Sequence, residues 1–277
     1  MKILLEIGPM HLSKTNTLKM IFELAWLRVR LLLRQKLGWL SIGVGVALVF
    51  LSLVTAQVSW VNPQKIFWDF SLAVIFVLQI SLAVFLGTQL FHDEKNRRTL
   101  HLLLSSGVSR TSWAIGNGLG IFAGLSAMAI LWFVVTLITD SLAFEGLSLT
   151  MPLQTVLLLI VEVLVVVFFS MLLSFLLRPL LALAVSSSLV IFLHSLESLE
   201  RIFTDPNVGR FVDKAMASYV LEIAKVLPPL HWLDLKSFVG YEASLPWIQV
   251  GQLGIMGVLW AGLCVLAASL RFERMDL

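Results

Sequence analysis

The stretch LQTVLLLIVEVLVVVFFSMLLSFLLRPLLALAVSSSLVIFLHS, residues 153–195, decides the fold class. It contains two apolar runs, each close to the ~20 residues that a helix needs to cross the hydrocarbon core of a bilayer. Only Arg178-Pro179 separates the two runs, and a proline directly after an arginine favours a tight turn. We therefore predict two membrane-spanning helices, at 153–177 and 180–195.

Three similar apolar runs precede this stretch and one follows it. Tryptophans lie near several of their ends, as is typical of the membrane interface. Of the 277 residues, 58% are hydrophobic and 13% are charged, about half of the ~25% charged residues usual in soluble domains. No segment remains for a large soluble domain. We predict an all-α polytopic membrane protein: residues 1–36 form a cytoplasmic N-terminus, and residues 37–277 form one six-helix domain. The four further spans are expected at 37–57, 69–91, 113–139 and 247–270.

The distribution of lysine and arginine predicts the orientation of these spans. With the N-terminus inside, 14 of the 20 basic residues lie in cytoplasmic segments and six lie outside. The positive-inside rule then places both termini in the cytoplasm, which agrees with an even number of spans. The membrane expected is a bacterial inner membrane. We interpret the basic residues as topology determinants, so no nucleic-acid partner is expected.

Two segments outside the spans are also predicted to be helical. Residues 18–36 form an amphipathic helix that suits the membrane interface, with Arg28 on its apolar face. Its polar stripe falls within about 60° at 100° per residue and consists of Lys19, Glu23, Arg30 and Arg34. The outer segment 196–246 has helical spacing in ESLERIF and VDKAMASYVLEIAKVL, separated by the turn-forming Asp205-Pro206-Asn207. Short helices on or in the outer leaflet are expected there.

A search for catalytic motifs returns mostly absences. No Gly-Lys pair occurs, so the phosphate-binding loop of an ATPase is missing, and no His/Cys cluster has the spacing of a zinc site. We expect no enzyme activity, no metal and no cofactor in this chain. Gly116, Gly120 and Gly124 recur every four residues and predict a smooth helix face for close packing.

Three polar residues inside the predicted spans are candidates for a pathway or for contacts between helices: Glu162, Ser187 and His194. An ionised acid at the depth of Glu162 costs on the order of 2.5–3.5 kcal/mol, so this residue is protonated, paired or facing a wet interior. Both interpretations stay open. Glu162 is expected near the middle of the membrane and His194 near its outer edge, which disfavours a catalytic acid–base pair.

The inner stretch FHDEKNRRTLHLLLSSGVSRTSWAIGNGLG, residues 91–120, joins the second and third spans. A charged turn precedes a short amphipathic helix, Thr99 to Ser105, which ends at Ser105-Ser106-Gly107. Such a helix can dock into a groove on a cytosolic partner and transmit rigid-body motion. The alternative is an ordinary charged inner loop that fixes topology.

This stretch resembles the corresponding loop of the ABC-2 family of exporter permeases. The matching positions are Glu94 and Lys95, Thr99 and Leu100, Leu103 and Leu104, and Val108, Ser109 and Arg110. Four positions depart from the family pattern: Arg98 replaces a glycine, His101 a glutamate, Gly107 a proline and Asn117 a lysine. The order of spans and the segment after the fifth span are also similar to the family.

The resemblance implies an exporter permease that pairs with a second copy or a homologue. Two cytosolic ABC ATPase subunits would bind ATP and Mg²⁺, and the 93–110 loop would couple them to the path through the membrane. The residues expected to couple are Glu94, Lys95, Arg98, Thr99, Leu100, Leu103, Leu104, Ser109 and Arg110. The 18–36 helix would flank this contact. Two alternatives remain: a non-transporting membrane scaffold that recruits a cytosolic partner, and a membrane-embedded enzyme centred on Glu162 and His194. No motif encodes the substrate.

Overall fold

Helices dominate the computed structural model of the chain, which describes residues 17–60, 62–144, 149–204, 222, 227–236, 239 and 244–275. No strand occurs among these residues. Six helices are long and apolar enough to cross a membrane. They are α3 (Lys36–Gln57), α4 (Pro63–Asn96), α6 (Arg110–Ala143), α7 (Thr150–Leu176), α8 (Pro179–Thr204) and α10 (Trp247–Glu273). The predicted all-α polytopic fold with six spans is confirmed.

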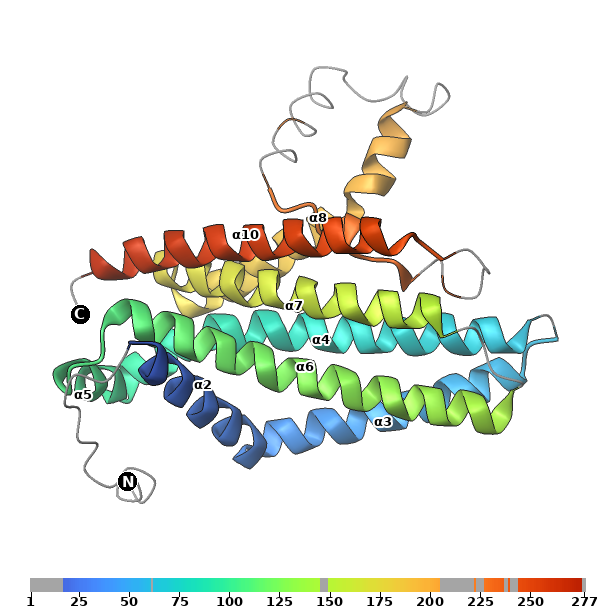
Figure 1. Cartoon of the computed structure of the whole chain (residues 1–277), viewed down its shortest axis with the longest axis horizontal. Coiled ribbons are helices and arrows are strands. Elements are labelled where there is room, and N and C mark those ends of the chain that lie inside the picture. The colour runs from blue at the N-terminus through green and yellow to red at the C-terminus, as the bar shows by residue number, and fades with distance from the viewer. Residues whose placement is uncertain are drawn as a thin grey trace.

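Among the described residues, three shorter elements lie outside these spans: α2 (Thr17–Arg34), α5 (Thr99–Ser105) and the 3-10 turn η2 (Leu230–Trp232). Figure 1 shows the long helices side by side, with α5 at one end of the bundle, where α2 begins and α10 ends. We call this the α5 end. Helix α7 contacts α4, α6, α8 and α10, so it lies at the centre of the bundle.

Helices α4 and α6 are longer than the spans predicted from hydropathy. Each has 34 residues, or about 51 Å at 1.5 Å per residue, against about 30 Å of hydrocarbon. Hydropathy marks the part that lies in hydrocarbon, whereas the helical hydrogen bonding continues into the polar ends. The sequence suggested that Glu94 and Lys95 lie in a charged turn before α5. In the structure they belong instead to the last turns of α4.

The turn at Arg178-Pro179 lies where the sequence places it. Helix α7 ends at Leu176, Leu177 is extended with φ −122° and ψ 161°, and α8 begins at Pro179. Helix α8 continues to Thr204, so the predicted helix at 197–203 is the end of α8 and not a separate element. The predicted turn at 205–207 and nearly all of the predicted helix at 212–227 lie outside the described residues.

The chain before α10 packs back onto the bundle. Leu230, Leu233 and Leu235 are buried, and η2 contacts α8. Further along, the Gln154 side chain of α7 donates a hydrogen bond to the Leu245 carbonyl at 2.8 Å and accepts one from the Leu245 N–H at 3.2 Å. These contacts place charged residues of the 227–236 segment beside α7 and α8.

Candidate functional site

The link between α4 and α6 makes two sharp turns. Arg98, which precedes α5, has φ +57°, and Gly107, which follows it, has φ +94°. This left-handed region favours glycine, because a side chain there meets the backbone. The ABC-2 loop that this stretch resembles has glycine at the position of Arg98, and the backbone of Arg98 has the conformation that suits glycine. At position 107, where the family has proline, a φ of +94° is one that proline cannot adopt.

Glu94 is held inside the protein by residues of two other helices. Arg28 of α2 lies 3.5 Å away, from its Nη1 to the Oε1 of Glu94, and the two side chains are 12% and 16% exposed. The indole N–H of Trp113 in α6 donates a hydrogen bond to the other carboxylate oxygen at 2.7 Å. Burial lowers the pKa of Arg28, and the negative charges of Glu94 and Asp93 oppose this effect. These contacts join α2, α4 and α6.

The predicted glycine face of α6 packs against α2. A Cβ atom at Gly116 would lie 2.7 Å from the Cβ of Leu24, and one at Gly120 would lie 2.6 Å from the Ala25 carbonyl oxygen and from the Cβ of Arg28. At Gly124 the nearest atom would be the Cδ1 of Leu32, at 2.9 Å. Successive turns of α2 therefore follow successive turns of α6, and this close approach positions Arg28 for Glu94.

Arg110 fastens the end of α10 to the start of α6. Its Nη1 donates to the carbonyls of Phe272 and Glu273, both at 3.0 Å, and of Met275 at 2.7 Å. Thr111 adds a hydrogen bond from its hydroxyl to the Glu273 carboxylate at 2.9 Å. The last carbonyls of a helix have no partner within it and carry partial negative charge, so a guanidinium satisfies both needs.

Ser109 and a group of aromatic rings complete this junction. The Ser109 side chain accepts a hydrogen bond from the Ser112 N–H at 3.1 Å and caps α6. Rings from four helices, α4, α6, α7 and α10, pack edge-on, tilted or stacked with centroids 4.9–6.5 Å apart: Phe91, Trp113, Phe175 and Phe272. The α5 end is thus a rigid platform.

Helix α5 presents a different face than the family match suggested. Leu100 is fully buried, and Leu103 and Leu104 pack against the core, so these three leucines face inward. The exposed side chains are His101, Leu102 and Ser105, and Leu102 is 60% exposed. Leu102 was not among the predicted coupling residues. At 100° per residue it lies 200° from Leu100, so a buried Leu100 requires an outward Leu102.

The other residues predicted for the coupling loop and for the 18–36 helix are partly in contact with neighbouring groups and partly exposed. Lys95 lies 5.8 Å from the Phe91 ring centroid, Arg98 is exposed, and the Thr99 hydroxyl donates to the Glu94 carbonyl at 3.2 Å. On α2, the polar stripe faces away from α6. Lys19 lies 3.9 Å from Glu23, Arg30 lies 5.0 Å from the Trp26 ring centroid, and Arg34 is exposed.

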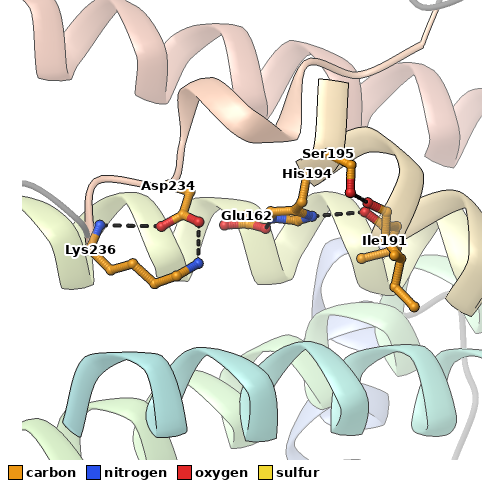
Figure 2. A network of polar contacts seen from close by, with 7 residues as sticks. Glu162, Ile191, His194, Ser195, Asp234 and Lys236 are labelled. Carbon is orange, nitrogen blue, oxygen red and sulfur yellow. Dashed lines mark hydrogen bonds and ion pairs between the residues drawn. The ribbon is translucent and has the colours of Figure 1, made fainter. Parts of the chain in front are cut away.

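A second polar site lies between α7, α8 and the 227–236 segment (Figure 2). His194 Nε2 lies 2.6 Å from Oε1 of the fully buried Glu162, although the sequence analysis expected the two at different depths. Helix α8 brings His194 toward the centre of α7, so this expectation is wrong. Ser187, two turns earlier on α8, is half-buried, and no hydrogen bond joins it to this pair.

The 2.6 Å distance between His194 Nε2 and Glu162 Oε1 is favourable only when one of the two groups carries a proton. His194 Nδ1 lies 2.8 Å from the Val190 carbonyl oxygen, which can only accept, so Nδ1 carries a hydrogen. Either Nε2 or the carboxyl group carries the other proton that makes the 2.6 Å contact favourable. The pair is thus either an ion pair or two neutral groups.

Asp234 and Lys236 complete this site and were not predicted as site residues. They form an ion pair with each other, and the Lys236 ammonium lies 3.7 Å above the Phe76 ring of α4. The same ring meets the His194 imidazole edge-on at 5.0 Å. The Asp-Leu-Lys sequence was the available signal, but only its packing against α7 and α8 shows that it lies beside Glu162.

Within the described residues no group of three or more His, Cys, Asp or Glu side chains could hold a metal ion. Comparison with protein-family models and with curated proteins finds no match for this chain.

Proposed function

We propose that this protein is the membrane subunit of an ATP-driven exporter of the ABC-2 kind, and that α5 docks on a separate cytosolic ATPase. One observation carries the proposal: a short helix with an exposed Leu102 projects from a platform in which α2, α4, α6, α7 and α10 are joined. A push on α5 would reach these helices as rigid-body motion. The resemblance of residues 94–110 to the family loop supports the same assignment.

The structure separates two groups of residues at the α5 end, and only some of them are among the expected coupling residues. The side chains of Glu94, Ser109 and Arg110 make hydrogen bonds within the chain, so they would hold the platform together. His101, Leu102 and Arg98 are exposed, so they would touch the partner. A second permease copy would complete the path, and the α5 end would face the cytoplasm.

The test starts from a search for an ABC ATPase gene beside the gene of this chain. ATP hydrolysis by the encoded ATPase is then measured with and without the full-length membrane protein. We expect a stable complex in which the membrane protein changes the hydrolysis rate severalfold. Leu102→Glu should abolish this change, because a charge replaces the apolar contact, whereas the control Leu102→Met should retain it. A stable complex with an unchanged hydrolysis rate would favour the scaffold alternative, and no complex would overturn the coupling role.

A further inference from the structure

A cavity of about 410 Å³ opens at the α5 end, on the side of α4 away from Glu94. Its walls come from the last turns of α4, the turn between α7 and α8, and the last turn of α10. The cations Lys95, Arg178 and Arg271 line it, one from each of these elements. We call it the basic cavity.

The charges of the basic cavity are not balanced from within. No lining residue is acidic, and the three cations form no ion pair with any described residue. At 100° per residue, Asp93 and Glu94 point about 130° or more away from the middle of the α4 face that lines the cavity. Glu273 of α10 receives the Thr111 hydrogen bond instead.

The start of helix α8 also favours an anion in this place. The 26-residue helix α8 begins at Pro179, which lines the cavity. Proline has no N–H, and the Ala182 N–H donates to the Arg178 carbonyl, so the free N–H groups of this helix start are those of Leu180 and Leu181, which add partial positive charge next to the cavity. Cations at the ends of α4 and α10 would by themselves only complement the carbonyls there. Complementing helix ends does not explain why cations from three elements lie around one cavity.

The neighbouring surface indicates where the anion comes from. Phe91, Phe175 and Leu176 supply apolar wall, and Leu176 is 50% exposed. Leu180, in the first turn of α8 beside the cavity, is 77% exposed, as suits a residue in contact with acyl chains. The cavity therefore combines cations at the end of the spans with apolar surface along them.

We propose that the basic cavity binds the phosphate headgroup of an anionic phospholipid from the leaflet on the α5 side. Basic pockets between membrane helices suit such headgroups, and each nearby cation contributes about a fivefold gain in affinity. This inference does not depend on the proposed export function.

The test is native mass spectrometry of the full chain titrated with phosphatidylglycerol or with phosphatidylcholine, which carries the same phosphate but no net charge. We expect tighter binding of phosphatidylglycerol by the unmodified chain. The double variant Arg178→Gln/Arg271→Gln should lower that affinity at least about tenfold, toward that of phosphatidylcholine. Arg97→Gln/Arg274→Gln is the matched control, because both residues are exposed at the same end but do not line the cavity.

Several outcomes would overturn the proposal. The first is an unchanged affinity for phosphatidylglycerol in the cavity variant, and the second is an equal loss of that affinity in the control variant. The third is displacement of the lipid by millimolar inorganic phosphate, which would indicate that the cavity binds a free anion. A different result would assign the cavity to a protein contact. In that case the chain would show no preference between the two lipids, and it would bind the partner ATPase in a salt-sensitive way that the cavity variant loses. Lys95→Gln, measured alone together with thermal unfolding, keeps the test valid if the double variant misfolds.

Discussion

Glu162 and His194 show how one buried contact fixes what a substitution can do. Glu162→Gln keeps the shape and places an amide N–H opposite His194 Nε2, so a hydrogen bond can persist in place of the 2.6 Å contact. Glu162→Leu leaves Nε2 of the His194 imidazole unpaired in the interior, while Nδ1 keeps its hydrogen bond to Val190. We expect Leu to lower the free energy of unfolding in detergent by about 1 kcal/mol relative to Gln.

Thermal unfolding of both variants measures this difference. Under the proposed export function, a transport assay of the same variants separates packing from proton chemistry. Equal stability of the two variants would show that the contact does not hold α7 and α8 together. Loss of transport in both, with only the Leu variant destabilised, would assign the shared proton to the transport cycle.

Arg28 and Glu94 make a second prediction at the same scale. Because both side chains are mostly buried, removing either one leaves a charge without its partner. Arg28→Ala and Glu94→Ala should each lower the free energy of unfolding. The loss in the double variant should be smaller than the sum of the two single losses by about 1–3 kcal/mol. A double-mutant cycle of chemical unfolding measures this coupling, and additive effects would show that the 3.5 Å contact has no energetic role.

At the scale of elements, the pairing of α2 with α6 depends on the absence of side chains. Gly120→Ala would push a methyl group against the Ala25 carbonyl and the Arg28 side chain, so we expect a loss of about 1–3 kcal/mol. Gly262→Ala in α10 is the matched control, since its Cβ would meet nothing within 4 Å. That change should be neutral or stabilise by up to about 1 kcal/mol, because alanine favours helices.

Unfolding curves of the two alanine variants give the comparison. Because Gly120 also sets the place of Arg28, the Gly120→Ala variant should lose most of the coupling between Arg28 and Glu94. If the two alanine variants were equally stable, the glycine face of α6 would not be a packing surface.

At the scale of the whole molecule, the predictable and the unpredictable parts have different physical origins. Hydrophobicity over about 20 residues reports burial in hydrocarbon, so all six spans and the turn at Arg178-Pro179 could be predicted. The contact of Glu162 with His194, the position of Lys236 and the outward face of α5 depend on how helices pack. No local pattern carries that information, and a hydropathy estimate of depth misplaced His194.

The orientation of the whole bundle gives the last prediction. Leu102 at the α5 end and Trp60 between α3 and α4 are both exposed, and one span separates them. Because the positive-inside rule places the excess of lysine and arginine in the cytoplasm, we expect Leu102 to face the cytoplasm and Trp60 to face outward. The chain has a single cysteine, Cys264, which is buried, so Cys264→Ala provides a background for new thiols. A membrane-impermeant maleimide should label Trp60→Cys in intact cells and Leu102→Cys only after permeabilisation. The reverse pattern would invert the bundle and place α5 beyond the reach of any cytosolic ATPase, whereas labelling of both from one side would contradict the span between them.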